Sequence, residues 1–93
     1  MFTWDLRKAK INFSKHDVSF EEASTIFSDP RALQWVDAEH AAAERRFKRL
    51  GVSVEHRVLI VIYTVRRTSD GQEEIRVISA RQASRKERKA YAG

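Results

Sequence analysis

Residues 57–80, RVLIVIYTVRRTSDGQEEIRVISA, predict a β-hairpin that decides the fold. The apolar run at 57–65 is typical of a central strand buried on both faces, although a short buried helix has the same pattern. The pair Asp70-Gly71 is a strong turn signal, so residues 74–80 are expected to return antiparallel. Alternation would divide the side chains of this returning strand into Ile75, Val77 and Ser79 on one face and Arg76, Ile78 and Ala80 on the other.

Before the hairpin, the sequence predicts two helices and two short strands. The helices are expected at residues 4–17 and 18–30, and the strands at 31–36 and 45–52. Between these strands, residues 37–44 form a polar connection that could contain a helical turn.

Capping signals mark both helices. Asp5 is a suitable N-cap for the first helix. Ser19 and Glu22 have the spacing of a capping box at the start of the second. Asp29-Pro30 ends the second helix because the residue before a proline avoids the helical region. The side chains expected to be buried are Leu6, Ala9 and Phe13 in the first helix, and Val18, Phe20, Ala23, Ile26 and Phe27 in the second.

A short third helix is predicted at residues 85–91, where Ser84 and Glu87 again have capping-box spacing. Seven residues are too few for a stable helix in water, so this segment must dock on the sheet through Tyr91 or its flanking alanines. The expected architecture is one α+β domain spanning residues 1–93. It has two N-terminal helices, an antiparallel sheet of three to four strands and the C-terminal helix.

The composition limits the classes of partner and site that the protein can have. A net charge of +5 and a pI near 10 indicate a polyanionic or acidic partner. The chain has no cysteine, which excludes disulfides and thiolate metal sites. No apolar segment approaches the length of a membrane span, and the N-terminus lacks the apolar run of a signal peptide. We therefore expect a cytoplasmic protein without membrane contacts.

The histidines give little support for a metal or another cofactor. His16, His40 and His56 lack short ligand spacing. A weak divalent site at Asp37, Glu39 and His40 is less favoured than a polar loop. The chain also lacks a Gly-rich phosphate loop and a nucleophile elbow. No cofactor and no metal are expected.

The distribution of basic side chains favours nucleic-acid binding. Antiparallel pairing would bring the ends of the last two strands together, so their arginines could cluster and bind phosphates in bidentate fashion. Lys8, Asn12 and Lys15 form a polar stripe on the first helix with His16 beside it, although such stripes are usually solvated faces. The strand-end arginines are Arg57, Arg66, Arg67, Arg76 and Arg81, and the rings that could stack on bases, or belong to the core, are Trp35, Tyr63 and Tyr91.

Metal-free RNA cleavage sets three chemical requirements. A base must deprotonate the ribose 2′-OH, cations must stabilise the phosphorane, and an acid must protonate the departing 5′-oxygen. Histidine is the natural acid or base near neutral pH. The sequence supplies these residue types without arranging them.

Several ordered motifs resemble the BrnT-like toxins. FTWDLRKAKINFSKHDVSFEEA (2–23) is similar to the family's N-terminal signature of W-D, Lys, Asn, Lys-His and V-S-F-x-E-A, and residues 27–30 continue its F-x-D-P. ERRFKRLG (44–51) resembles its E-x-R-F…G strand. IRVISARQASRKERKAY (75–91) resembles its ending, R-I-I-S-A-R-x-A-x-x-x-E-R-x-x-Y. The resemblance runs from Phe2 to Tyr91 without an evident insertion.

This resemblance implies a RelE-like fold and a bacterial type II toxin that cleaves RNA and arrests translation. It also implies a cognate antitoxin with a ribbon-helix-helix DNA-binding region, so that operator DNA is bound only through the toxin–antitoxin complex. The positions that match the family pattern are Lys8, Asn12, His16, Arg66, Ser79, Arg81, Glu87, Arg88 and Tyr91, with a weaker match at Asp37 and His40.

We therefore expect a metal-independent endoribonuclease that acts by 2′-OH attack. Arg81 and Arg66 are expected to bind the scissile phosphate, and His16 or His40 to act as acid or base. Tyr91 is expected to stack on a base or orient the phosphate. The residues expected to contact RNA are Lys8, Asn12, Lys15, Arg76, Arg85 and Arg88.

Two other functions are compatible with the sequence. One is a non-catalytic basic module that binds nucleic acid or an acidic protein partner, for which binding would be salt-sensitive and RNA would stay intact. The other is a structural component whose basic surface mainly seats the antitoxin.

Overall fold

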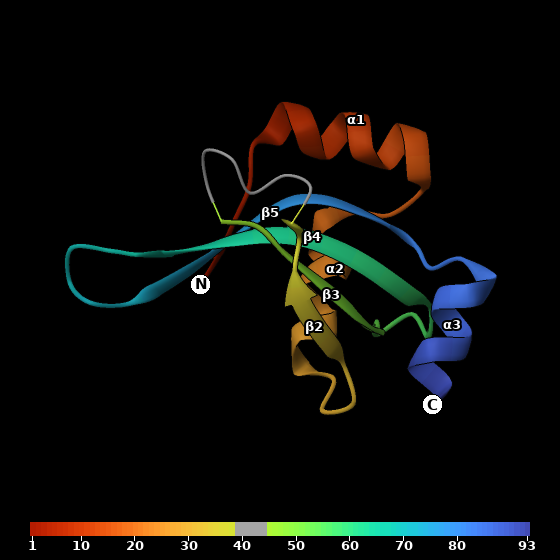
Figure 1. Ribbon diagram of the computed structural model, residues 1–93. Helices are drawn as coiled ribbons and strands as arrows, with labels where there is room; N and C mark the ends of the chain where they lie inside the picture. The colour runs from red at the N-terminus through yellow and green to blue at the C-terminus, as the bar shows by residue number, and fades with distance from the viewer. Residues whose placement is uncertain (39–44) are drawn as a thin grey trace.

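The computed structural model of the chain describes residues 1–38 and 45–93 and shows an α+β architecture (Figure 1). The described residues form a five-stranded sheet, so the expected three to four strands were too few. None of their helices is long and apolar enough to cross a membrane. The elements are β1 (Phe2–Thr3), α1 (Leu6–His16), α2 (Phe20–Thr25), the 3₁₀ helix η1 (Ile26–Ser28), β2 (Leu33–Val36), β3 (Phe47–Val52), β4 (Val58–Arg67), β5 (Glu73–Gln82) and α3 (Arg85–Ala92).

The sheet has the order β1-β5-β4-β3-β2, in which β1 is parallel to β5 and the other pairs are antiparallel. The predicted hairpin is confirmed: β4 pairs with β5, and Gly71 in the turn has a φ of 84°. The hairpin projects beyond the rest of the sheet (Figure 1). The additional strand is β1, which was not predicted because two residues carry no periodic pattern.

The sheet has two covered faces. On one, Leu59 and Val61 of β4 are buried with residues of α2 and η1. On the other, Ile60 is buried in a smaller cluster with Ala83, against which Tyr91 of α3 packs. We call these the α2 face and the α3 face. Burial of β4 on both faces confirms the prediction of a central strand, and the contact of Tyr91 confirms that α3 docks on the sheet.

A β-bulge in β5 overturns the predicted alternation of that strand. Tyr63 of β4 pairs with Val77, but Ile62 pairs with Ser79, so Ile78 is an extra residue. A bulge of this kind shifts all following side chains to the opposite face. Ser79 therefore lies on the α3 face, not with Val77. The same shift carries Arg81 to the α3 face, where it pairs across from Ile60.

The predicted buried stripe of α1 is wrong at Leu6 and Phe13, whereas Ala9 is partly buried and packs against the core. Leu6 is 74% exposed and Phe13 is 53% exposed, whereas Asn12 is buried. This helix lies at the edge of the sheet beside β5 (Figure 1). The predicted N-cap is confirmed, because the Asp5 side chain accepts a hydrogen bond from the Lys8 N–H.

The other two helices begin at the predicted caps. The Ser19 side chain accepts a hydrogen bond from the Glu22 N–H, but the Glu22 carboxylate does not complete a capping box. It accepts hydrogen bonds from Ser53 and from Arg57 instead. In α3, both hydrogen bonds of the box between Ser84 and Glu87 are present.

Candidate active site

A hollow of about 220 Å³ lies between α1 and β5 and gathers basic and polar side chains. Lys8, Lys15 and His16 line it from α1, and Ser79 lines it from β5. Helical periodicity places Lys8, Lys15 and His16 together, because residues seven and eight apart lie on one side of a helix. The bulge accounts for the position of Ser79, because it turns this side chain toward the α3 face. One molecule of water takes up about 30 Å³, so the hollow has room for a phosphodiester group.

Asn12 also lines this hollow and has a structural role. Its amide nitrogen donates hydrogen bonds to the carbonyl oxygens of Val18, at 3.0 Å, and Ala80, at 2.9 Å. Its amide oxygen accepts a hydrogen bond from the Ala80 N–H at 3.1 Å. Both amide hydrogens are used within the fold, so the contact of Asn12 with RNA stays a prediction that these hydrogen bonds do not support. The side chain instead fastens α1 to β5.

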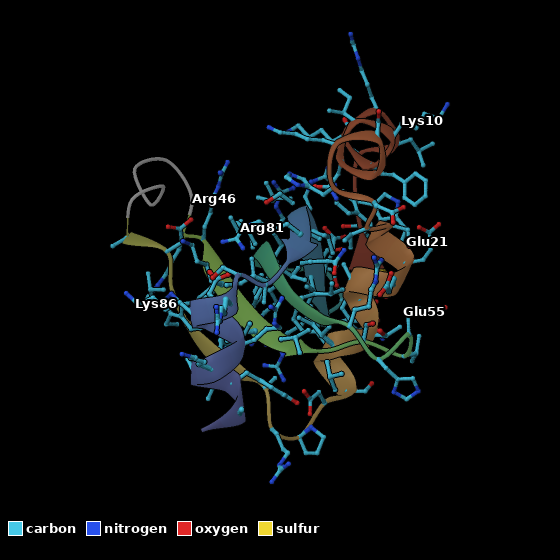
Figure 2. All side chains as sticks on the ribbon, turned by 90° about the vertical axis from the view of Figure 1, so that its right-hand side faces the viewer. Lys10, Glu21, Arg46, Glu55, Arg81 and Lys86 are labelled. Atoms are coloured by element: carbon cyan, nitrogen blue, oxygen red, sulfur yellow. The ribbon has the colours of Figure 1, made fainter. Side chains whose placement is uncertain are left out.

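Arg81 lies at the end of β5 and is held by Glu87 of α3. The two terminal guanidinium nitrogens donate to the two carboxylate oxygens, at 2.7 and 2.9 Å. Glu87 also accepts a hydrogen bond from the Ser84 N–H at 2.8 Å. Figure 2 shows Arg81 on the same side of the sheet as Arg46 and Lys86. Arg81 is therefore a fixed cation of the α3 face.

The hydrogen bonds from Arg81, together with those from Ser84, lower the pKa of Glu87 from an ordinary 4.5 to about 2. A carboxylate whose pKa is lower in the folded chain stabilises the fold above its unfolded-state pKa. We therefore predict that this contribution is lost as the pH falls from 4.5 to about 2. In urea unfolding at several pH values, Glu87→Gln should remove that part of the acid sensitivity, whereas Glu55→Gln at an exposed site should retain it. Equal pH profiles of the parent chain and Glu87→Gln would contradict this prediction.

The arginines of the last two strands do not form the single cluster that was predicted, because Arg66 and Arg76 lie near the hairpin turn and Arg81 lies far from them. Arg66 pairs with Glu74 near the hairpin turn, whereas Arg81 pairs with Ile60, six residues away along β4. At about 3.3 Å per residue, their Cα positions are roughly 20 Å apart. The expectation that Arg66 and Arg81 both bind the scissile phosphate is therefore not supported by this geometry. Arg76 lies between them along β5, on the α3 face.

Arg57 belongs to a different part of the molecule. Its Nε donates to Glu22 at 3.0 Å, and its Nη2 donates to the Asp17 carbonyl oxygen at 2.8 Å. Arg57 therefore ties the start of β4 to α2 and to the end of α1. The hydrogen bond from Arg57 is the main cause that lowers the pKa of Glu22. This arginine is structural and does not join the candidate site.

Tyr91 is also occupied within the fold. Its hydroxyl donates to Asp29 Oδ2 at 2.6 Å, and its ring packs against the cluster of Leu50, Ile60 and Ala83. The hydrogen bond to Asp29 is the main cause that raises the pKa of Tyr91. A hydroxyl and a ring that are committed in this way anchor α3 to the segment before β2. A role of Tyr91 in stacking on a base or orienting a phosphate stays a prediction, and these contacts do not support it.

The remaining expected site residues are exposed or lie outside the described residues. Arg85 and Arg88 are exposed on α3, where Arg88 donates a hydrogen bond to the Ala83 carbonyl oxygen at 3.1 Å. His40, and most of the polar connection at 37–44, lie outside the described residues. Within residues 1–38 and 45–93, no group of three or more His, Cys, Asp or Glu side chains could hold a metal ion.

The α3 face also has an accessible row that the sequence interpretation missed. The strand register pairs Ser79 with Ile62, Ile62 with Lys48, and Lys48 with Trp35. With strands about 4.8 Å apart, this row extends roughly 14 Å from the hollow to β2. Trp35 is 41% exposed, whereas Tyr63, on the α2 face, is buried. Counting the register outward from the hairpin turn would not have placed Ser79 in this row, because the regular register pairs Ile62 with Ile78 and only the bulge brings Ser79 opposite Ile62.

Comparisons with known proteins agree with the geometry. Residues 4–87 match the family model of the ribonuclease toxin BrnT of type II toxin–antitoxin systems. The chain is also similar to the crystal structure of the ribonuclease toxin BrnT of Brucella abortus, with 26% sequence identity and a TM-score of 0.63. That alignment covers 91% of this chain and 99% of the Brucella chain. Among curated proteins, no sequence matches.

Proposed function

The chain belongs to the BrnT family of ribonuclease toxins of type II toxin–antitoxin systems, and from this membership we propose a metal-independent endoribonuclease that arrests translation. A cognate antitoxin neutralises it in this proposal. The observation that carries the proposal is the meeting of His16, Lys8 and Lys15 with Ser79 in one hollow. The imidazole can transfer a proton and the two ammonium groups can stabilise the phosphorane, which are two of the requirements of metal-free phosphodiester cleavage.

His16 acts at the reacting atoms in the proposed mechanism. A base removes the proton of the 2′-OH, and the resulting oxygen attacks the adjacent phosphorus. The bond from phosphorus to the 5′-oxygen then breaks, and an acid protonates that oxygen. The products are a 2′,3′-cyclic phosphate and a free 5′-OH. An imidazole in the hollow can perform either proton transfer near neutral pH.

Cations around the hollow stabilise the charge that develops on the phosphorane. Lys8 and Lys15 supply charge within the hollow itself. Arg81 lies one alternate position beyond Ser79 on the same strand face. Its bidentate pairing with Glu87 fixes its position, so little conformational entropy is lost when RNA binds. Preorganised charge of this kind stabilises a transition state more than mobile charge does.

The RNA strand crosses the sheet along the row from Ser79 to Trp35 in this proposal. The exposed Trp35 ring supplies a surface on which a base can stack, worth about 1–3 kcal/mol per base. Lys48 lies between Trp35 and the hollow, where it can contact a phosphate. Arg76 and Arg66 lie farther toward the hairpin and bind phosphates away from the scissile one.

The test incubates the purified chain with 5′-labelled single-stranded RNA in EDTA, with and without ribosomes. We expect cleavage that persists in EDTA and leaves a 2′,3′-cyclic phosphate. A matched RNA with a 2′-deoxy sugar at the cleavage position should stay intact. Activity that is lost in EDTA and restored by Mg²⁺ would overturn metal independence. Intact RNA in every arm, with salt-sensitive binding, would favour the non-catalytic basic module instead.

The antitoxin partner follows from the family, whose toxins act within toxin–antitoxin pairs. We propose that the cognate antitoxin carries a ribbon-helix-helix region and that operator DNA is bound only through the complex. The net charge of +5 supports contact with an acidic partner segment. Co-expression of the chain with its antitoxin should restore growth, and DNA retardation should require both proteins.

A further inference from the structure

The outer edge of β2 is open to another strand. β2 ends the strand order of the sheet, and within the described part of the chain no strand pairs with its outer side (Figure 1). The N–H of Asp37 donates to the Arg46 carbonyl oxygen at 2.8 Å, so the backbone groups of Asp37 face β3. The direction of these groups alternates along an antiparallel strand. Trp35 therefore also faces β3, whereas the N–H and C=O groups of Gln34 and Val36 point outward from the sheet.

The side chains of β2 do not protect this edge. Edge strands are commonly protected by a lysine, a proline or a bulge, and β2 contains none of these. Its one polar side chain, Gln34, is held on the α2 face, where its Oε1 accepts a hydrogen bond from Arg49 at 2.8 Å. This contact fixes β2 in position before any partner binds. The apolar side chains of β2, each between 39% and 42% exposed, are Leu33, Trp35 and Val36.

A second copy of β2 fits this edge by symmetry. In an antiparallel two-fold arrangement centred on Trp35, Gln34 of one copy lies opposite Val36 of the other, so the outward N–H and C=O groups of both copies pair. A register shifted by one residue would set outward groups against groups that already face β3. Trp35 then lies opposite Trp35 of the second copy, at a position without hydrogen bonds between the two strands. Side chains are closest at such positions, so the two rings come into contact.

Charge does not oppose this pairing, despite the net charge of +5. β2 itself carries no charged residue. The cations beside it are Lys48 and Arg49 of β3. In the paired arrangement the two β3 strands lie three strand spacings apart, or roughly 14 Å. This distance exceeds the Debye length of about 8 Å at physiological ionic strength, so the repulsion between these cations is largely screened.

We propose that the chain forms a two-fold dimer in which the two β2 strands pair, so that two five-stranded sheets become one sheet of ten strands. Both α3 faces then lie on the same side of the joined sheet. The row from Ser79 to Trp35 continues into that of the second copy and extends over seven strand spacings, or roughly 34 Å. Trp35 of the second copy thus adds a ring to the RNA path. This consequence rests on the proposed function, whereas the dimer itself does not.

The test is sedimentation velocity of the purified chain over about a hundredfold range of concentration, in which we expect a reversible dimer. Val36→Pro removes only an N–H that points away from β3, so the pairing of β2 with β3 should persist. Each copy loses one donor, and the dissociation constant of the dimer should rise at least about tenfold. Val36→Lys keeps the backbone, places a lysine at the edge and should have the same effect. The matched control is Val54→Lys, at a 68% exposed position outside the sheet, which should dimerise within threefold of the parent.

Amide hydrogen exchange locates the contact. The amides of Gln34 and Val36 should exchange more slowly as the concentration of the parent chain rises. A parent chain that stays monomeric throughout would overturn the inference, even if an antitoxin strand then protected the same two amides. A dimer retained at parental affinity in folded Val36→Lys would also overturn it, because the contact would lie elsewhere. A parent that dimerises through β2 but cleaves no RNA would uphold this inference and defeat the ribonuclease proposal, and a monomer that cleaves RNA would do the reverse.

Discussion

His16→Ala is expected to slow RNA cleavage by about 10²- to 10⁴-fold, the range in which a general acid or base contributes. His16 is half-buried at the C-terminal end of α1 and lines the hollow with two lysines. Alanine keeps the helix and both lysines, so substrate binding should change much less than the rate of the chemical step. Single-turnover cleavage at saturating enzyme, together with RNA affinity from a filter assay, separates the two.

The matched control is His56→Asn. His56 is exposed in the turn before β4 and has a φ of 61°, a left-handed conformation that asparagine tolerates. His56 lies next to Arg57, which contacts α2, and it does not line the hollow. Its substitution should therefore leave the rate of RNA cleavage within threefold of the parent. If folded His16→Ala also cleaved within threefold of the parent, another group would supply the proton transfers, and the role of His16 would be lost.

Asn12→Leu is expected to lower the free energy of unfolding by about 3–5 kcal/mol, although leucine is close to asparagine in size. The substitution removes the acceptor of the Ala80 N–H and the donor to the carbonyl oxygens of Ala80 and Val18. Each buried group that loses its partner costs about 1–3 kcal/mol. Urea unfolding followed by circular dichroism measures the change.

Two variants test the cause of this loss. Ser14→Ala, on the exposed side of the same helix, should change the free energy of unfolding by less than about 0.5 kcal/mol. Asn12→Asp keeps an acceptor for the Ala80 N–H but sets a carboxylate oxygen against carbonyl oxygens, so it should be at least as destabilising as leucine. A loss below about 1 kcal/mol in Asn12→Leu would show that Asn12 does not fasten α1 to β5.

The fold was predictable where a single segment carries its own signal. The apolar run of β4, the Asp70-Gly71 turn and the caps at Asp5, Ser19 and Ser84 all depend on neighbouring residues, and each is present. The prediction failed for β1, because its two residues form a strand only by pairing with β5. It also failed for α1, whose Leu6 and Phe13 have helical periodicity but face a groove.

The candidate site was predictable in its composition and not in its arrangement. Lys8, Lys15 and His16 share one side of α1 by periodicity alone, and the family pattern added Ser79 and Arg81. The clustering of arginines failed because ten-residue strands keep the two ends of a hairpin far apart. No sequence rule predicted the structural roles of Asn12 and Tyr91, because their partners Ala80 and Asp29 lie 68 and 62 residues away.

The sequence by itself determined the helices, the central hairpin, the basic charge and the family, because these follow from local propensities and ordered motifs. Only the tertiary structure decided which side chains meet. The bulge at Ile78 is the clearest case: one extra residue in β5 turns Ser79 and Arg81 from the face of Val77 to the α3 face. A strand has a side-chain period of two, so a shift of one residue exchanges the two faces. That shift depends on pairing with β4, so the alternation of polar and apolar residues in β5 does not predict it.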